Sequence, residues 1–509
     1  MIQPERVQYL NEEYAARGRY VLYWMQQSQR ASCSHALELA VREADRLKLP
    51  VVAVFGITQR FPEAVERHYA FMLEGLAETR AALERRGVKL VVRLEPPVDA
   101  VLSLAGKTSL VVTDRGYLRI QRSWRERLAR KLPCRFIQVE SDVVVPVETA
   151  SDKEEYAART IRPKIGRELD RFLKPLEESG PARDSLDMRI AGLDVSRPGS
   201  VLKKLRVGRA GGRGERGAGA VAGGLRAAAG AAGGPGDGAR VAGGLRAGAR
   251  GAGGHSGEVH GAGGPGARGR LTGGPDEAQR LLDVFLSENL NGYPEAHSDP
   301  GLDCQSELAP YLHFGQISPL DIALRVRAKR GVRKESKDAF LEELIVRREL
   351  AMNFCFYNEE YDSYSCLPEW AAQTLGKHTR DRREYVYDEA ALESARTHDP
   401  CWNAAQSEMR ATGKMHGYMR MYWGKKIIEW TRTPREAFEI ALRLNNRYSL
   451  DGRDANSFAG VAWCFGKHDQ AWKERPVFGK VRWMSAAGLE RKFHMDDYVE
   501  RVARLSGER

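Results

Sequence analysis

Short apolar runs alternate with amphipathic stretches over the first 140 residues of the chain. The runs are rich in valine, leucine and isoleucine and lack regular polar alternation, which is typical of strands buried on both faces of a sheet. We expect strands at residues 19–25, 50–57, 88–94, 109–114 and 134–140. We expect amphipathic helices near residues 35–47, 63–86 and 120–131. This alternation predicts a Rossmann-like α/β domain over residues 1–140, with helices on both faces of a parallel sheet.

The residues of this α/β domain do not reveal a ligand. No G-x-G-x-x-G motif follows the first expected strand, and no P-loop motif occurs in the chain. Those glycine-rich turns are what bring backbone N–H groups close to bound phosphates. The common dinucleotide and nucleoside triphosphate interpretations therefore lack support.

The composition changes abruptly over residues 208–274, where glycine, alanine and arginine dominate and no aromatic residue occurs. This segment holds 27 of the 51 glycines and contains an imperfect internal repeat. It cannot bury enough apolar surface to offset the entropy of ordering it, so we interpret it as a disordered insertion. Its nine arginines allow nucleic-acid binding, but composition favours a neutral expansion of repetitive coding sequence.

From residue 275 to residue 509 the pattern is helical, which predicts an all-α domain, joined to the first domain by an interdomain connection at residues 141–207. Apolar residues recur at helical spacing over residues 276–290, 318–330, 338–358, 415–430 and 433–448. Seven of the nine tryptophans lie in this part: Trp370, Trp402, Trp423, Trp430, Trp463, Trp472 and Trp483. Because a buried indole needs a partner for its N–H group, so many of them indicate a role beyond packing.

Charge and cysteine content indicate which partners and which cellular compartment to expect for the protein. The formal net charge of +12 favours a polyanionic partner, although half of this excess lies in the insertion. The seven cysteines are scattered without a C-x-x-C pair, so neither a disulfide framework nor a metal site is indicated. No apolar run reaches the roughly 20 residues that span a bilayer, and the start of the chain lacks an apolar leader. We expect a soluble intracellular protein, in the cytoplasm of a prokaryote or the nucleus of a eukaryote.

One expected helix, MHGYMRMYWGKKIIEW, mixes indoles with several cations. Arg420, Trp423 and Trp430 share one of its faces, whereas Tyr418 and Met421 lie roughly opposite. One interpretation is a core helix whose long basic side chains extend to water. The other is a helix that lies between two aromatic, charge-bearing sites.

Longer motifs decide between these interpretations. QSELAPYLHFGQIS (residues 305–318), MHGYMRMYWGKKIIEW and LNNRYSLDGRDANSFAGVAWCFGKHD (residues 444–469) resemble the flavin-binding helical domain of the photolyase and cryptochrome family. YVLYWMQQSQR (residues 20–30), FLEELIVRREL (residues 340–350) and YWGKKIIEW resemble class II cyclobutane pyrimidine dimer photolyases in particular. The resemblance covers essentially the whole chain apart from the glycine-rich insertion.

This resemblance implies a bent FAD, active in its reduced form, within the helical domain. Asn445 matches a residue that faces flavin N5, and Arg420 with Asp451 matches an ion pair beside the flavin ring. The full set of implied cofactor-binding residues is Tyr293, Ser306, Leu308, Arg348, Arg420, Asn445 and Asp451. Without the resemblance, these residues would read as ordinary helix caps, a solvated turn and a structural salt bridge.

The resemblance also implies an electron chain of Trp402, Trp423 and Trp430, which passes electrons to a photo-oxidised flavin. Two of these indoles lie two helical turns apart, a spacing that permits short electron steps. Simple core packing would explain the same spacing. The electron-transfer role therefore rests on the resemblance rather than on periodicity.

The implied substrate pocket contains Tyr418 and Met421, with Trp463 stacking on the lesion and Glu343 bonding to one of its bases. Glu343 and Asn445 are thus expected catalytic residues beside the three indoles. The alternative for Glu343 is a plain helix pair with the residue four positions later. Lysines around the pocket would meet DNA phosphates: Lys425, Lys426 and Lys467.

These residues together predict light-dependent repair of pyrimidine dimers by a monomeric enzyme, with UV-damaged DNA as partner and no membrane attachment. An antenna chromophore, a deazaflavin or a folate, is possible in the α/β domain under the same resemblance. The main alternative is a cryptochrome-like flavin photoreceptor without repair activity. A nucleic-acid-binding protein without catalysis is a further alternative, which would leave the indole chain unexplained.

Overall fold

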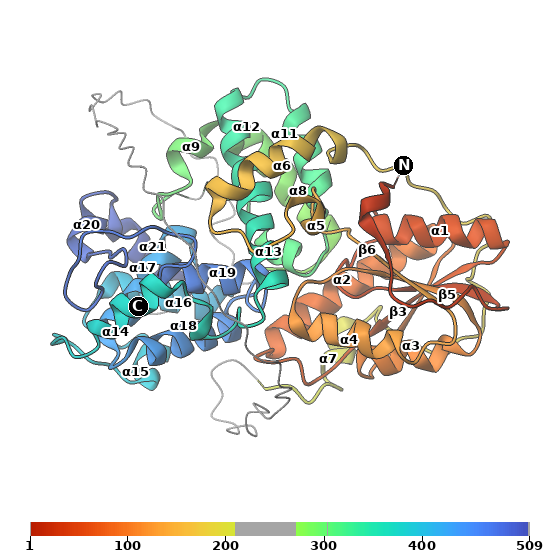
Figure 1. Cartoon of the computed structure of the whole chain (residues 1–509), viewed down its shortest axis with the longest axis horizontal. Coiled ribbons are helices and arrows are strands. Elements are labelled where there is room, and N and C mark those ends of the chain that lie inside the picture. Colours follow the sequence, from red (N-terminus) through yellow and green to blue (C-terminus); the bar gives the residue numbers. More distant parts are fainter. Residues whose placement is uncertain (1, 209–270, 303, 507–509) are drawn as a thin grey trace, which may run out of the picture.

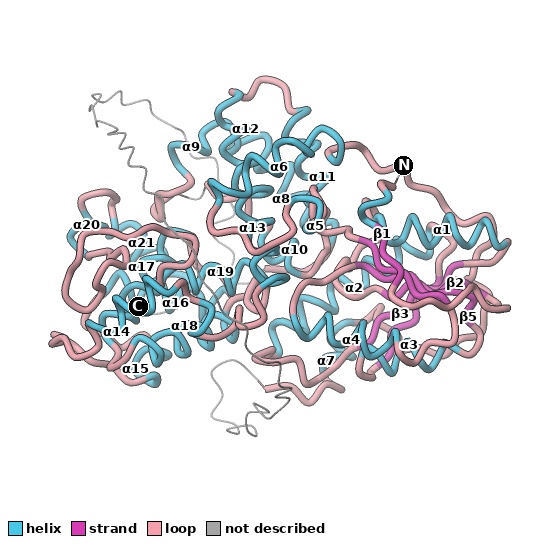
Figure 2. The backbone as a smooth tube through the Cα atoms, viewed as in Figure 1, coloured by secondary structure: helices cyan, strands magenta, loops and turns pink. Residues whose placement is uncertain are grey.

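The structure is a computed structural model that describes residues 2–208, 271–302 and 304–506. All the strands of the sheet gather at one end of the molecule, and the remainder of the described chain is helices and loops (Figure 2). Figure 1 shows the N-terminal α/β part beside a helical part that contains the C-terminal half of the chain. The predicted fold class is therefore confirmed.

Six strands form one sheet in the order β1-β6-β5-β2-β3-β4. Strands β2 to β6 run parallel, and β1 pairs antiparallel with β6 at the edge. Their bounds are β1 (Val7–Tyr9), β2 (Tyr20–Trp24), β3 (Val51–Gly56), β4 (Lys89–Arg93), β5 (Thr108–Asp114) and β6 (Arg135–Val139). The five expected strands all form, within two residues of the expected bounds. Strand β1 was not expected, because three residues are too few to show a period.

Helices cover both faces of this sheet, and alternate residues of β2 show how. Val21 and Tyr23 pack with apolar residues of α1 (His35–Leu47) and α2 (Glu66–Arg85). Leu22 and Trp24 point to the other face, toward α3 (Pro97–Ala105) and α4 (Arg119–Ala129). Helices α1, α2 and α4 were expected from the sequence, whereas α3 was not.

Residues 141–207 do more than connect the two parts. They contain α5 (Val147–Ala150), α6 (Ala158–Phe172) and α7 (Pro198–Leu202). Leu193 donates its backbone N–H to the Val92 carbonyl at 2.7 Å, so this segment covers the edge strand β4. Arg162 of α6 forms an ion pair with Glu342 at 2.7 Å and so ties the connection to the helical part.

The helical part begins where the described chain resumes. Its helices are α8 (Pro275–Val284), α9 (Tyr293–Ala296), α10 (Ala309–His313), α11 (Pro319–Ala328), α12 (Lys334–Leu341), α13 (Arg348–Tyr357), α14 (Glu369–Lys377), α15 (Glu389–Glu393), α16 (Pro400–Thr412), α17 (Gly417–Trp430), α18 (Pro434–Tyr448), α19 (Ala455–Cys464), α20 (Ala486–Glu490) and α21 (Met495–Ser506). Two π-helical segments, Phe285–Asn289 and Glu342–Arg347, extend α8 and join α12 to α13. Shorter 3₁₀ turns lie at Pro4–Arg6, Leu290–Gly292 and Tyr364–Cys366.

The five expected helices of this part all form. Thr433 caps α18 as its sequence indicated, because its hydroxyl accepts a hydrogen bond from Glu436 N at 3.1 Å. The helix expected at residues 415–430 begins two residues later, since His416 is its N-cap and accepts from Tyr418 N. No helix among the described residues is long and apolar enough to cross a bilayer.

The two described ends of the expected insertion both lie on α2. Gly208 accepts a hydrogen bond from Glu66 N at 2.9 Å, and Gly273 N donates to Glu74 at 2.9 Å. Residues 209–270, which make up the rest of that insertion, lie outside the described residues. The expectation of disorder concerns those residues and stays a prediction. Both described ends of the insertion are thus hydrogen-bonded to the same helix.

Candidate active site and interdomain cavity

Three indoles form one buried cluster between α16 and α17. The Trp402 ring lies 6.4 Å from the Trp423 ring, centroid to centroid, with the two planes 8° apart. It lies 5.6 Å from the Trp430 ring. Each of these side chains is at most 2% exposed. The structure therefore brings the three predicted electron-chain residues together, with Trp402 in contact with both others.

Local sequence fixes this cluster. Asp399 caps α16 by accepting from Trp402 N at 2.9 Å, and proline follows it at the first helical position. The Trp402 indole then donates to the Trp423 carbonyl at 3.0 Å, and the Trp423 indole donates to Gln406 at 2.9 Å. Both N–H groups are satisfied without water, so the rings are held in fixed orientations.

Arg420 and Asp451 form the predicted ion pair. Two guanidinium nitrogens lie 3.0 and 3.1 Å from the two carboxylate oxygens, and Ser449 accepts a further hydrogen bond from Arg420 at 3.2 Å. Burial would raise the pKa of Asp451, but the charge and hydrogen bonds of Arg420, together with the hydrogen bond from Ser449, outweigh burial and lower that pKa. The Asp451 carboxylate therefore stays ionised at neutral pH.

Three predicted cofactor-binding residues carry buried polar atoms without a partner among the described residues. These atoms are Asn445 Oδ1, Arg348 Nη2 and Arg420 Nε. Asn445 is fully buried, and its amide nitrogen donates to Ser457 at 2.5 Å, which leaves the oxygen as a free acceptor. A buried polar atom without a partner costs about 1–3 kcal/mol, so these groups fit a polar ligand such as a flavin, which offers both donors and acceptors.

The residues expected at the FAD phosphates lie in and after α9. Tyr293 begins α9, is 9% exposed and stacks on His297 with ring centroids 4.7 Å apart. Ser306 lies in the loop before α10, and Leu308 is the buried residue directly before that helix. The structure places all three in the helical part, and their contact with phosphate stays a prediction.

Tyr418, Met421 and Trp463 line one hollow, as the substrate-pocket prediction requires. Two turns of α17 supply the first two residues, and the last turn of α19 supplies the third. The other lining residues come from a C-terminal loop and α20: Arg482, Trp483, Met484, Ser485, Gly488 and Leu489. Sequence reasoning missed this second wall because the loop has no periodic pattern.

Glu343 does not line that hollow in the part of the chain that the structure describes. Its side chain is 52% exposed and lies 3.9 Å from Arg347, four residues later. The helix-pair alternative is therefore what the structure contains. The role of Glu343 at the lesion stays a prediction.

The expectation that three lysines meet DNA phosphates is wrong. Lys425 is fully buried and donates to the Cys464 carbonyl at 2.5 Å. Lys426 pairs with Glu429 at 2.8 Å, and Lys467 is buried with its ammonium on the Cys366 carbonyl at 2.9 Å. Helical spacing could not show this burial, because it depends on contacts between distant segments: Lys425 meets the end of α19, and Lys467 meets the segment around Cys366.

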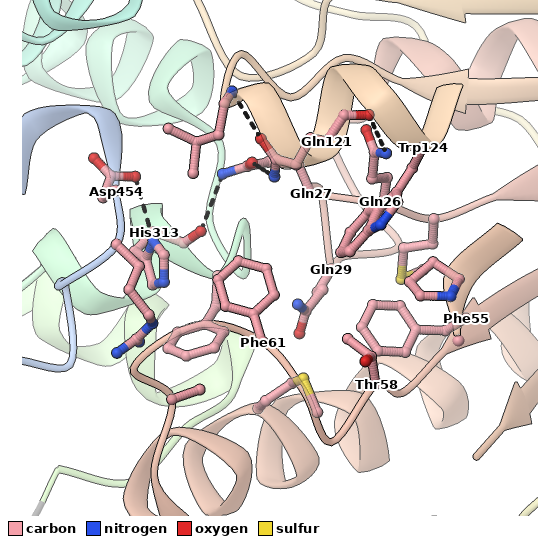
Figure 3. Close-up of a pocket in the computed structure, with 18 of the residues that line it drawn as sticks. Gln26, Gln27, Gln29, Phe55, Thr58, Phe61, Gln121, Trp124, His313 and Asp454 are labelled. Atoms are coloured by element: carbon pink, nitrogen blue, oxygen red, sulfur yellow. Dashed lines mark hydrogen bonds and ion pairs between the residues drawn. The ribbon is translucent and has the colours of Figure 1, made fainter. Parts of the chain in front are cut away.

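A second cavity lies between the α/β part and the helical part (Figure 3). Together with its open mouth it encloses about 990 Å³. Its walls come from the segments that follow β2, β3 and β5, from α2 and α4, and from the segments around His313, Met352 and Asp454 of the helical part. The labelled residues of Figure 3 are Gln26, Gln27, Gln29, Phe55, Thr58, Phe61, Gln121, Trp124, His313 and Asp454.

The strand order explains this cavity. The chain passes from β2 outward through β3 and β4, then returns to β5 on the other side of β2. Loops at the carboxyl ends of β2 and β5 therefore diverge, which is where open α/β sheets bind ligands. Asp114, at the end of β5, holds the β2 loop by accepting from Gln26 N at 3.1 Å and Gln27 N at 2.6 Å. The sequence search for glycine-rich motifs could not find a site of this kind.

Hydrogen bonds link the two parts across one wall of this cavity (Figure 3). Gln121 donates to Gln27 at 2.6 Å, and Gln27 donates to the His313 carbonyl at 3.1 Å. The His313 ring lies 3.3 Å from Asp454. Burial would raise the pKa of Asp454, but the hydrogen bond and charge of His313, with the charge of Arg348 and the backbone N–H of Asn456, lower it to about 2.

Comparison with known proteins identifies the class of fold to which this arrangement belongs. A solved archaeal photolyase from Sulfolobus tokodaii, described as holding two FAD molecules, has the same fold, with a TM-score of 0.63, 14% identity, and coverage of 96% of this chain and 92% of that one. Residues 21–182 match the sequence profile of a family described as DNA photolyase. The fold is that of the photolyases and cryptochromes.

Full-length relatives define the family. A deoxyribodipyrimidine photo-lyase from Methanothermobacter thermautotrophicus is 47% identical over 510 residues, which covers 100% of both chains. A deoxyribodipyrimidine photo-lyase from Potorous tridactylus is 36% identical, over 95% of this chain and 81% of that one. The chain belongs to the DNA photolyase family, so the resemblance seen in its motifs is confirmed.

Proposed function

We propose that this protein is a deoxyribodipyrimidine photo-lyase that uses light and reduced FAD to repair cyclobutane pyrimidine dimers in DNA. One observation carries the proposal. Helix α17 supplies Tyr418 and Met421 to a hollow with Trp463, and the same helix supplies Trp423 and Trp430 to the indole cluster. A single element thus links an aromatic hollow suited to a flipped-out base with a path for electrons.

The helical part, residues 275–509, would hold FAD through the unpartnered atoms of Asn445, Arg348 and Arg420. When bound and excited by light, the reduced flavin supplies one electron to the dimer. The Asn445 oxygen would accept a hydrogen bond from the flavin ring, and the Arg420 guanidinium would favour its anionic form. The ion pair with Asp451 fixes that guanidinium in place.

The aromatic hollow would receive the damaged bases. A dimer stacks poorly in duplex DNA, which lowers the cost of turning it out. The Trp463 indole offers a flat apolar face, and base stacking on an aromatic side chain contributes about 1–3 kcal/mol. Tyr418 and Met421 would close the other sides, and Arg482, an exposed cation in the lining, would meet phosphate. The proposed enzyme acts as a monomer on UV-damaged DNA.

The interdomain cavity would hold an antenna chromophore, a deazaflavin or a folate, under this proposal. Its position at the divergent loops of β2 and β5 suits a flat ring system. Phe55, Phe61 and Trp124 supply apolar walls, while Gln26 and Gln121 supply hydrogen-bonding groups. Residues 1–140 are then the antenna domain and residues 141–207 its connection to the catalytic domain.

One assay tests the proposal. The purified protein is checked for flavin absorption, reduced, and illuminated with blue light in the presence of a duplex that contains one dimer. Restoration of the two pyrimidines, followed by chromatography, is the expected result, and Trp463→Ala should lose it while still binding undamaged DNA. A coloured protein without repair would indicate a photoreceptor instead, and a colourless DNA-binding protein would indicate no photochemistry at all.

A further inference from the structure

Lys425 is a buried cation that no ion pair explains. The side chain is fully buried, and no carboxylate lies within ion-pairing distance of it among the described residues. The ammonium lies 5.2 Å from the centroid of the Trp463 ring. Trp463 in turn lines the hollow with Tyr418 and Met421. A desolvated positive charge therefore lies directly beside the indole that faces this hollow.

The approach of two helices places the charge there. A Cβ atom on Gly424 would lie 2.6 Å from the Cys464 sulfur, so only glycine allows α17 to pack this closely on α19. Lys425 then reaches the Cys464 carbonyl at the C-terminal end of α19, where free carbonyls favour a cation. The neighbouring Lys426 differs, because it pairs with Glu429 at 2.8 Å.

Few charged groups face Lys425 from the surrounding elements. Burial is the main influence and lowers its pKa to about 8, Cys464 and Asp469 raise it, and Arg482 lowers it. Burial also raises the pKa of the Cys464 thiol, so that group stays neutral near pH 7. Lys425 is therefore mostly protonated at neutral pH and loses its charge in mildly alkaline solution.

We propose that Lys425 is a positioning residue that acts through Trp463, by holding a fixed positive charge beside the substrate hollow. This role rests on the proposed repair function. Its ammonium makes the Trp463 indole harder to oxidise and stabilises negative charge on a dimer stacked at that indole. The attraction between a cation and an aromatic ring is stronger away from water, and here a fully buried ammonium lies beside a partly buried indole. Arg482 lies 5.9 Å from the same ring but is exposed, so water screens its charge.

The charge matters because of the electron balance of repair. The dimer gains one electron, its two cyclobutane carbon–carbon bonds break, and the electron is then given back, so no net oxidation occurs. The substrate is negatively charged only between those two transfers. A fixed cation favours that state over premature return of the electron, whereas an easily oxidised Trp463 would compete with the intended donor.

Lys425 also caps α19, and pH separates this structural role from the electrostatic one. A neutral amine still donates a hydrogen bond to the Cys464 carbonyl, whereas its charge is gone. The test measures repair per absorbed photon by the pre-reduced FAD enzyme at saturating dimer-containing oligonucleotide, from about pH 6 to about pH 10. For the unmodified protein we expect a fall with a midpoint near the Lys425 pKa of about 8.

Variants identify the titrating group. Lys425→Met should repair about threefold less per photon and show no fall, because one unit charge is missing at every pH. Its affinity for the same oligonucleotide in the dark should be unchanged, since the bases of the dimer carry no charge until the electron arrives. Lys425→Arg should keep high repair across the range, because its charge does not titrate. Lys426→Met, which removes the adjacent paired cation, should behave as the unmodified protein.

Two results would overturn the inference and leave only the capping role. In the first, Lys425→Met repairs dimers as well as the unmodified protein; in the second, the alkaline fall in repair persists in that variant. The proposed function would survive that result, because the unmodified enzyme would still repair dimers. If the unmodified enzyme repairs none at any pH, both proposals fail. Should Lys425→Met not fold, the profile of the unmodified protein and of Lys425→Arg still decides the question.

Discussion

At the scale of single residues, the indole cluster shows how local contacts prepare an electron path. Trp402 stacks on Trp423 and touches Trp430 edge to face, and all three rings are shielded from water. Because two of their N–H groups are already bonded inside the protein, the rings cannot reorient without breaking a buried hydrogen bond. The cluster is thus rigid before any electron moves.

The first prediction concerns Trp423→Phe. We expect photoreduction of the oxidised flavin to be lost, because the aromatic contact between Trp402 and Trp423 is weakened and phenylalanine is much harder to oxidise. Repair by chemically reduced enzyme should stay close to normal, since that reaction does not use the cluster. The measurement compares flavin bleaching under light with dimer repair after chemical reduction. Trp370→Phe, outside the cluster, is the matched control and should bleach normally; loss of both activities in Trp423→Phe would mean a structural role.

The second prediction concerns Asp454, which caps α19 and faces His313. Its folded pKa of about 2 lies below the unfolded value, which is about 3.9, so its stabilisation is present above about pH 4 and is lost as the pH falls through about 2. The difference corresponds to about 2.5 kcal/mol. Asp454→Asn keeps a capping oxygen but not the charge. In urea titrations it should be less stable than the original at neutral pH, and the two should converge in acid; an equal gap at both pH values would contradict this origin.

Several site residues could be predicted from the sequence, and several could not. Trp423 and Trp463 were identified because long motifs carry them, and Trp402 because the family resemblance implies it; the structure gathers the three indoles as two groups on shared elements. Motifs said nothing of Trp483 on the far wall of the hollow. The burial of Lys425 was missed because a residue's exposure depends on which helices meet, and periodicity within one helix does not record that.

At the scale of elements, the contact between α17 and α19 places both the hollow and its buried cation. Gly424 allows the contact, and any side chain there meets the Cys464 sulfur. We predict that Gly424→Ala destabilises the protein by about 1–3 kcal/mol, the usual cost of overpacking. Thermal or urea unfolding measures this.

Gly460 provides the matched control for that substitution. It lies in α19, and a Cβ atom there would meet nothing within 4 Å. Gly460→Ala should therefore be neutral or stabilise the protein by about 0.5–1 kcal/mol, as expected from helix propensity alone. Combining Gly424→Ala with Cys464→Ala should restore part of the lost stability. Equal effects of the two glycine substitutions would show that helix propensity, and not the contact, decides.

Long, buried helices and strands agree closely with those predicted from the sequence. Five parallel strands were predicted because fully buried strands read as unbroken apolar runs. Helix α3 was missed, since it begins at the second of two consecutive prolines and spans only Pro97–Ala105, which favours reading it as a loop. The π-helical segment Glu342–Arg347 was predicted as plain helix, because one residue of extra winding leaves the apolar pattern nearly unchanged.

At the scale of the whole molecule, the interdomain cavity depends on both parts at once. Its floor comes from the loops that follow β2 and β5, and its far wall from the segments around His313 and Asp454. Neither part alone encloses it, which is why no local motif predicted it. Binding of the proposed antenna would therefore depend on how the two parts are joined, and it should be lost with any change that separates them.

The last prediction concerns the glycine-rich insertion. Glu66 and Glu74, which anchor its two described ends, are eight residues apart on α2, or about 12 Å. A linker of about six residues spans this distance easily. Replacing residues 209–270 by such a linker should leave the unfolding temperature and dimer repair unchanged, because every described contact is kept.

A longer deletion serves as the control. Removing residues 208–274 would also remove the hydrogen bond from Gly274 N to Gln316, which measures 2.8 Å, and both contacts with α2. Each such lost bond costs about 1 kcal/mol, so this variant should unfold several degrees earlier than the shorter deletion. If the shorter deletion instead proves as unstable as the longer one, residues 209–270 contribute to the fold itself and are not a neutral insertion.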